Sequence, residues 1–144
     1  MDWFIGLLEK ICLVFFFKHD IFQVPPCTQV QLTIEDSLSS LVNPKQIYRS
    51  QILSLSSQTY FKCDTNYSFV YNWTITSVAT GFSVDLTTNP TSSASQLVIQ
   101  AYSLPYGVYS VQLRADLAAN ASYNTLYSTA TSYVQILPLS LIHI

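Results

Sequence analysis

Apolar and polar residues alternate with a period of two in several segments between residues 24 and 138, whereas helical spacing is weak. The clearest segment is 67–75, in which every odd position is aromatic or aliphatic, while Ser68, Asn72 and Thr74 lie on the opposite face. Such alternation predicts a β-strand with one buried face. Alternating segments or short apolar runs occur at 30–34, 52–55, 67–75, 82–86, 97–99, 109–115 and 133–136.

Turn-forming residues separate these segments at 43–44 (Asn-Pro), 80–81 (Thr-Gly), 89–90 (Asn-Pro) and 105–107 (Pro-Tyr-Gly). Proline fixes φ and glycine permits positive φ, so such residues favour turns between strands. About seven short strands with turns at this spacing predict an all-β fold, and we expect a β-sandwich. Closure of the same strands into a barrel would give the same alternation, so the pattern leaves that alternative open.

The chain has 144 residues, of which 49% are hydrophobic and only 10% are charged, and its net charge is −2. This length supports one domain with a real core, which we place at residues 24–138. Uncharged polar residues and tyrosine must therefore form much of the surface, as is typical of secreted β proteins. No cluster of Lys and Arg is present in the sequence, so we do not expect nucleic acid as a partner.

Residues 1–23 do not follow the strand pattern and form a doubtful N-terminal segment. The apolar run 11–17 is much shorter than the roughly 20 residues needed to cross a bilayer. A signal peptide would begin with basic residues, but this segment has Asp2 near its start, and Glu9 and Lys10 interrupt it. We expect a mispredicted start, because a Phe-rich stretch ending in Phe-Gln is what a translated splice acceptor gives. A degenerate signal sequence is the alternative.

Residues 139–144 (Leu-Ser-Leu-Ile-His-Ile) match the translation of a common sequencing adaptor, and we expect an adaptor-derived tail. The alternative is a short frayed terminus, which any domain can have. An adaptor-derived tail would mean that the natural protein continues beyond Pro138 and that this chain is a fragment. Both histidines, His19 and His143, lie in the two end segments, so residues 24–138 contain none.

Cys63, Trp73 and Tyr109 follow a pattern that is typical of immunoglobulin-like domains. In those domains a Cys on one strand packs against a Trp on the next, and a Tyr two residues before a second Cys hydrogen-bonds backward to close a corner. Here Val111 stands where the second Cys would be. We therefore expect no bridge between the sheets at this point, with Val111 filling the space as apolar volume.

Residues 24–138 resemble the receptor-for-egg-jelly (REJ) module of polycystin-like receptors. The resemblance rests on the order of YRSQILSLSS, Cys63, YNWTI, LVIQAYSLPYGVYSVQL and YVQILP. It implies an immunoglobulin-like β-sandwich of the PKD or REJ type with about seven strands. In that family such modules precede a membrane-spanning region.

The resemblance also implies a function and a location. The chain would be a non-catalytic module at the extracellular face of the plasma membrane, acting in ligand binding or adhesion or as a repeat of a structural stalk. Its partners would be an unidentified extracellular protein or glycan and the neighbouring modules of the receptor. Membrane attachment would come only through another part of the parent protein. The alternative is a small secreted domain that binds carbohydrate or protein.

Cysteine pairing follows from the position of Val111. Within the module the remaining pair is Cys27 and Cys63, whose bridge would contribute about 3–4 kcal/mol in the chain-entropy model. A pair of buried free thiols is the alternative and is more common in reducing compartments. Cys12 would be left over in the doubtful N-terminal segment.

Three N-glycosylation sequons begin at Asn66, Asn72 and Asn120, and they support an extracellular location. Asn72 is the strongest of the three, because the alternation that buries Trp73 directs Asn72 outward. A glycan there would keep this sheet face from packing on a neighbour. A fourth candidate at Asn89 is blocked by the proline that follows.

No catalytic residue, cofactor site or metal site is expected. The absence of histidine from residues 24–138 removes the usual base for activating Ser or Cys. A calcium site would require several clustered oxygen ligands, with Asp64, Asp85 and Asp116 as the candidates. The tyrosines that could form a binding surface cannot be separated from core residues by pattern, so no ligand site is assigned among Tyr102, Tyr106, Tyr123 and Tyr127.

Overall fold

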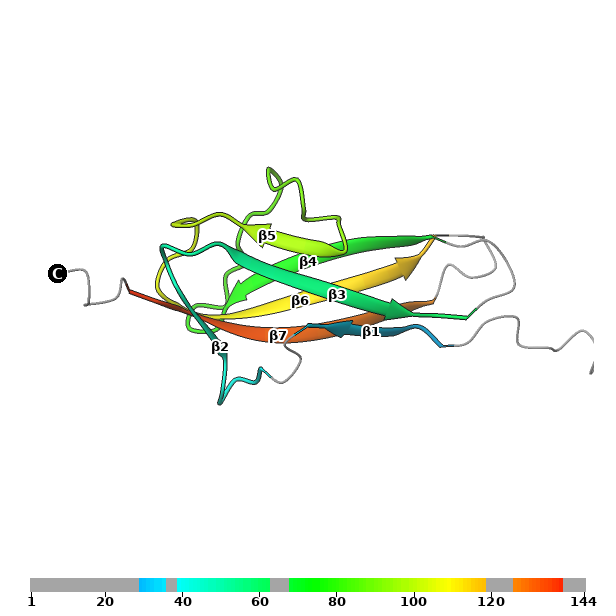
Figure 1. Ribbon diagram of the computed structural model, residues 1–144, viewed down its shortest axis with the longest axis horizontal. Coiled ribbons are helices and arrows are strands. Elements are labelled where there is room, and N and C mark those ends of the chain that lie inside the picture. Colours follow the sequence, from blue (N-terminus) through cyan, green and yellow to red (C-terminus); the bar gives the residue numbers. More distant parts are fainter. Residues whose placement is uncertain (1–28, 36–38, 63–67, 119–125, 139–144) are drawn as a thin grey trace, which may run out of the picture.

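The computed structural model describes residues 29–35, 39–62, 68–118 and 126–138. These residues form an all-β structure of seven strands in two sheets, a β-sandwich whose strands run along its long axis (Figure 1). In chain order the strands are β1 (Gln31–Ile34), β2 (Lys45–Tyr48), β3 (Leu53–Tyr60), β4 (Phe69–Ser77), β5 (Gln96–Ile99), β6 (Gly107–Leu117) and β7 (Tyr127–Leu137). The expected β-sandwich is therefore confirmed. No helix in the described residues is long and apolar enough to cross a bilayer.

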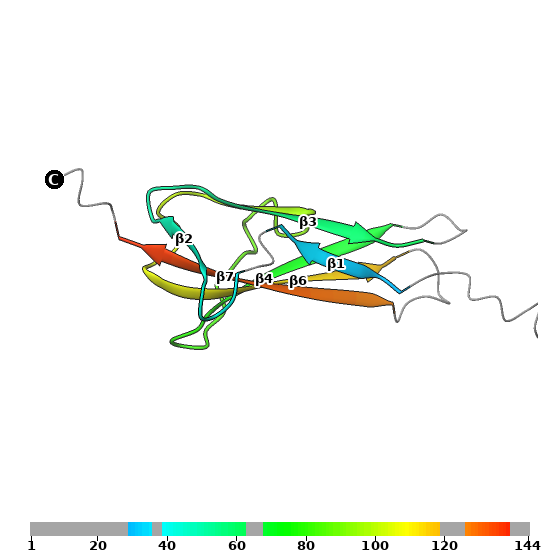
Figure 2. The ribbon, with the colours of Figure 1, turned by 60° about the horizontal axis from the view of Figure 1, so that its bottom comes forward.

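The two sheets have the orders β1-β3-β5 and β2-β7-β6-β4. All neighbouring strands are antiparallel except β2 and β7, which are parallel. The chain crosses from one sheet to the other between β1 and β2, so these short strands lie at edges of different sheets (Figure 2). The strand β6 is central, because it pairs along most of its length with β4 on one side and β7 on the other.

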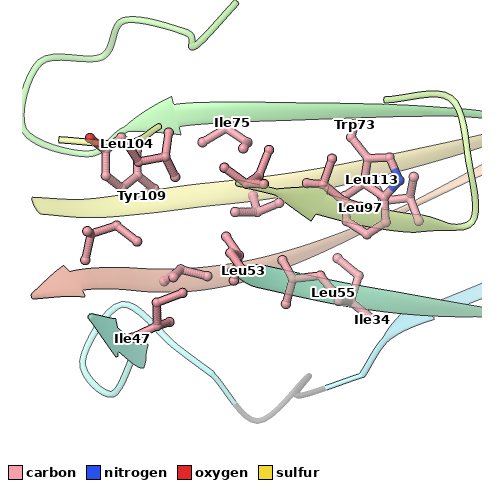
Figure 3. Packing of buried hydrophobic residues seen from close by; sticks show 14 of the residues in the cluster. Ile34, Ile47, Leu53, Leu55, Trp73, Ile75, Leu97, Leu104, Tyr109 and Leu113 are labelled. Carbon is pink, nitrogen blue, oxygen red and sulfur yellow. The ribbon is translucent and has the colours of Figure 1, made fainter. Parts of the chain in front are cut away.

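The core lies between the sheets and follows the alternation in the sequence. In β6 the inward side chains Tyr109, Val111, Leu113, Ala115 and Leu117 are each at most 5% exposed. The main cluster also contains side chains from each of the six remaining strands: Leu32, Ile34, Ile47, Leu53, Leu55, Trp73, Ile75, Leu97, Ile99, Val134 and Ile136. Figure 3 shows this packing. Full burial of one large aliphatic or aromatic side chain contributes about 1.5–3 kcal/mol, so this cluster dominates the stability of the fold.

The prediction of a strand at 82–86 is wrong, because this segment forms no ladder. Its backbone touches β4 at a single bridge between Thr76 and Ser83, and Phe82 is 78% exposed. The apolar residues Val84 and Leu86 pack only partly against the core. The alternation is real, but the segment follows the edge of the sandwich without forming a ladder.

The strand β2 was missed by the sequence pattern. It has only four residues, and Ile47 is the one that is buried. One buried residue produces no alternation, so nothing in the local sequence distinguishes this strand from a loop. Its parallel pairing with the end of β7 supplies the missing information.

The segment 82–92 covers the edges of both sheets on one side of the sandwich. Along β4, Val84 N–H donates to the Ile75 carbonyl at 2.8 Å, and Trp73 N–H donates to the Ser92 carbonyl at 3.1 Å. An open strand edge offers unpaired backbone groups to other chains, and covering it with a loop removes that hazard.

The edge of β5 is covered by side chains instead of by a strand. Val98 N–H donates to Thr91 Oγ1 at 2.9 Å, and the Val98 carbonyl accepts from Asn89 Nδ2 at 3.0 Å. The Thr91 hydroxyl is 2.7 Å from Asn89 Oδ1, which orients both side chains. Two polar side chains therefore replace the missing neighbouring strand at the middle of β5.

Replacement of Thr91 by valine keeps the side-chain shape but leaves the half-buried Val98 N–H without its acceptor. We expect Thr91→Val to lower the free energy of unfolding by about 1–3 kcal/mol in urea denaturation. The control is Thr88→Val, a nearby exposed position, for which the change should stay within about 0.5 kcal/mol. Equal stability of the two variants would contradict the proposed role of Thr91.

Candidate binding surface

Asn72 is the one residue among the predicted disulfide and glycosylation sites that lies in the described part of the chain. Cys27, Cys63, Asn66 and Asn120 lie outside the described residues. Asn72 is in the middle of β4, exposed on the outer face of the four-stranded sheet, while its neighbour Trp73 points into the core. The predicted outward direction of Asn72 is therefore confirmed.

The sheet face around Asn72 is mostly uncharged. Asn72 pairs across β4 and β6 with Arg114, whose guanidinium forms a bidentate ion pair with Asp116 at 2.9–3.0 Å. The guanidinium also stacks on the Tyr127 ring, 4.0 Å from its centroid. The hydrogen bond to Asp116 is the main cause that raises the pKa of Arg114. The Arg114 guanidinium is thus already engaged by Asp116 and Tyr127 on the same face of the sheet.

Trp73 and Tyr109 both lie in the core, and each directs its polar atom to a backbone carbonyl. Trp73 Nε1–H donates to the Ala94 carbonyl at 2.7 Å. The Tyr109 hydroxyl donates to the Pro105 carbonyl, four residues back, at 2.9 Å. Val111 is fully buried, as expected for a residue that fills core volume.

Cys63 lies outside the described residues, so its packing against Trp73 stays a prediction. Strand β3 ends at Tyr60, and its fully buried residues are Leu53 and Leu55. Leucine side chains thus occupy the inward positions of β3.

One end of the sandwich carries a cluster of side chains that the sequence pattern does not predict. It lies where β7 ends and where the turns 49–52 and 100–106 meet, near the label C in Figure 1. Three tyrosines there are exposed: Tyr48 by 39%, Tyr102 by 57% and Tyr106 by 53%. We call these three residues and Arg49 the Arg49 pole.

The exposure of Tyr102, Tyr106 and Tyr127 separates them from the core tyrosine Tyr109. Tyr123 lies outside the described residues.

Arg49 connects the segments that form this pole. Its backbone N–H donates to the Leu137 carbonyl at 2.9 Å, and its own carbonyl accepts from Tyr102 N–H at 2.8 Å. Its side-chain Nε donates to the Leu104 carbonyl at 3.2 Å, and the guanidinium lies 5.2 Å from the centroid of the Tyr106 ring. The backbone of Arg49 therefore links its own turn to the end of β7 and to the turn 100–106, and its side chain makes further contacts with that same turn.

Tyr102 adopts a backbone conformation that non-glycine residues rarely take. Its φ is +65°, in the left-handed region, which is strained for a residue with a Cβ. The hydrogen bond from its N–H to Arg49 holds this conformation, and the ring is left exposed. No feature of the local sequence predicts this, because glycine or asparagine would be the usual residue at such a position.

A groove of about 460 Å³ lies beside the pole, between the segment 84–91 and strand β5 with the turn that follows it. Its apolar lining includes Val84, Leu86 and Leu104, and Asp85 is the one charged residue in that lining. Hydrogen bonds from Thr87 N–H and the Thr87 side chain lower the pKa of the Asp85 carboxyl. The carboxylate therefore stays ionised at neutral pH.

The candidate calcium ligands do not come together in the described residues. Asp85 accepts a hydrogen bond from Thr87, while Asp116 pairs with Arg114, and Asp64 lies outside the described residues. No group of three or more His, Cys, Asp or Glu side chains that could hold a metal occurs in the part of the chain that the structure describes.

Comparison of the chain with protein-family models, with curated proteins and with solved structures found no match. The Arg49 pole is the most distinctive surface among the described residues, because it combines exposed tyrosines, a guanidinium over the Tyr106 ring and the positive φ of Tyr102.

Replacement of Tyr109 by phenylalanine should remove the hydrogen bond to Pro105 and lower the free energy of unfolding by about 1 kcal/mol at pH 7. Burial raises the pKa of Tyr109 above its ordinary value of 10.0, and the charge of Arg49 partly opposes this. The phenol of the unfolded chain thus ionises first, so this contribution is complete below about pH 10 and is lost as the pH rises through the folded pKa.

Urea denaturation of Tyr109→Phe and of the natural chain at pH 7 and above pH 10 measures both effects. The difference between the two proteins should shrink at the higher pH. Tyr127→Phe, at an exposed ring, is the matched control and should change little. A constant difference across this pH range would contradict the assigned ionisation.

Proposed function

We propose that this chain is a non-catalytic extracellular binding module, and that the Arg49 pole is its ligand-binding surface. The observation that carries the proposal is the exposure of three tyrosines around one arginine at the end of a rigid sandwich. Tyrosine and arginine are enriched among the residues that dominate binding energy, because they offer large contact areas and several hydrogen bonds.

We further propose that the sandwich is immunoglobulin-like and of the PKD or REJ type. The orders β1-β3-β5 and β7-β6-β4 agree with strands A-B-E and G-F-C of that fold. Trp73 on the strand that corresponds to C, and the backward hydrogen bond of Tyr109 on the strand that corresponds to F, support the same assignment.

A polycystin-like parent receptor remains a proposal that rests on the resemblance of residues 24–138. In such a parent the module would lie at the extracellular face of the plasma membrane, next to further modules. A long-read transcript that continues beyond the codon for Pro138 into such modules and membrane spans would support it. A message that ends after Ile144 would overturn it in favour of a small secreted binding domain.

The described residues also support the proposed disulfide. Strands β1 and β3 pair as far as Gln31 and Tyr60, and the adjacent residues Val30 and Phe61 pack in one cluster. Cys27 precedes Val30 by three positions and Cys63 follows Phe61 by two. At about 3.3–3.6 Å per residue, such short connections allow the two Cα atoms to approach within the roughly 7 Å that a disulfide requires.

An extracellular module should show both modifications in the protein isolated from its own cells. We expect peptide mass spectrometry to find Asn72 converted to Asp after enzymatic removal of N-glycans. We also expect Cys27 and Cys63 in one linked peptide that resists alkylation before reduction. Recombinant Asn72→Gln protein provides the unglycosylated standard. Unmodified Asn72 together with two alkylated thiols would contradict an extracellular location.

The binding function is tested by probing the full chain against an array of glycans and a panel of extracellular proteins. We expect saturable binding that falls at least about 10-fold in a Tyr102→Ser, Tyr106→Ser double variant, because hot-spot truncations cost about 2 kcal/mol or more. The control is Tyr60→Ser, at an exposed ring on β3. Silence across both panels would instead assign the chain a spacer role in a stalk.

A further inference from the structure

Among the residues that the structure describes, none forms an ion pair with Arg49. The three described turns at its end of the sandwich, 49–52, 78–82 and 100–106, contain no other charged residue. In the residues that the structure describes, the ion pair is formed by Arg114 and Asp116 on a different surface, and none involves Arg49. A half-buried cation without a counter-ion is a favourable place for an anion, because both groups gain when they meet away from bulk water.

The guanidinium of Arg49 is also held in one orientation. Its Nε is hydrogen-bonded to the Leu104 carbonyl, and both backbone polar groups are bonded, to Leu137 and Tyr102. The two Nη groups have no hydrogen-bond partner among the described residues. This leaves a planar pair of donors, which matches two oxygens of one carboxylate. A side chain that is already ordered loses less entropy when a ligand binds.

The rings around Arg49 form a shallow surface. The hollow lined by Tyr48, Arg49 and Tyr102 has a volume of only about 10 Å³, so no partner side chain can insert there as an anchor. The exposed rings of Tyr48, Tyr102 and Tyr106 instead offer flat apolar faces. The face of a pyranose that carries its C–H bonds packs well on such a ring, whose π-face is negative.

We propose that the Arg49 pole binds the carboxylate of an acidic sugar, a uronic or sialic acid. The two Nη groups of Arg49 donate to the carboxylate, and Tyr102 or Tyr106 packs against the sugar ring. A single carboxylate matches the single cation of these turns, and the flat exposed rings beside a very shallow hollow favour a sugar ring over an inserted peptide side chain. This inference rests on the proposed binding function and names its ligand class.

The test is a titration of the full chain, followed by ¹H–¹⁵N NMR, with methyl β-glucuronide and with methyl β-glucoside. The two probes share the same ring and differ only in the carboxylate. We expect the glucuronide to bind at least about 10-fold tighter, since hydrogen bonds to a charged group contribute about 1.5–3 kcal/mol. The amide signals of Tyr102 and Tyr106 should shift, and added NaCl should weaken the binding. Methyl sialoside should bind at the same place.

Substitutions of Arg49 distinguish the effect of its planar pair of donors from the effect of its positive charge. Arg49→Gln should abolish the preference for the glucuronide, and Arg49→Lys, which keeps the charge but loses the planar fork, should restore only part of it. Arg114→Gln is the matched control and should bind as the natural chain does. If Arg49→Gln unfolds, Tyr106→Leu provides a second variant, which should weaken the glucuronide and leave the fold intact by its NMR spectrum.

Three outcomes would overturn the inference. Equal affinity for glucoside and glucuronide would remove the role of the carboxylate, and the proposed binding function would survive. Equal affinity for the glucuronide and for N-acetyl-aspartyl methylamide would assign the pole to acidic peptides. Absence of binding by all acidic sugars would remove the ligand class, while the glycan and protein panels decide separately whether the chain binds anything.

Discussion

The pairing of β6 with β4 and β7 is the interaction on which the rest of the structure depends. β6 is registered with β4 from Tyr109 to Leu117 and with β7 from Gly107 to Asp116. These ladders satisfy the backbone of the longest strands and place every second β6 side chain against the other sheet. The fold has few charges to contribute ion pairs, so burial of this apolar face must supply most of its stability.

The sequence predicts those parts of the fold in which one strand face is buried along its whole length. Alternation around Trp73 and Val111 predicted both strands and the outward direction of Asn72, and the structure confirms them. The pattern fails at the edges. Phe82 belongs to an alternating segment that covers an edge without forming a ladder, and Ile47 is the lone buried residue of a real strand. Whether an edge segment forms a strand depends on backbone pairing with segments that are distant in the sequence, and local periodicity carries no information about that pairing.

The candidate site was less predictable than the fold, for a related reason. Arg49 lies in a short turn, and its contacts reach Leu104 and Leu137, which are distant in the chain. The positive φ of Tyr102 is held by the hydrogen bond from its N–H to the Arg49 carbonyl. The role of either residue therefore cannot be predicted from the local sequence. Tyr106 could be named as a candidate from the sequence, but only the tertiary structure shows its ring beneath the guanidinium.

The core and the Arg49 pole are physically one structure. The turn 100–106 carries two of the exposed tyrosines, and it is held from inside by the Tyr109 hydroxyl at Pro105 and from outside by Arg49 at Leu104. The hydroxyl of the core residue Tyr109 therefore helps to position the exposed tyrosines of this turn. A ligand bound to Arg49 would add a contact at the same turn and would stabilise the folded chain by mass action. Because the turn is already fixed from both sides, such binding requires little rearrangement of the backbone, which favours a rigid recognition surface over an induced one.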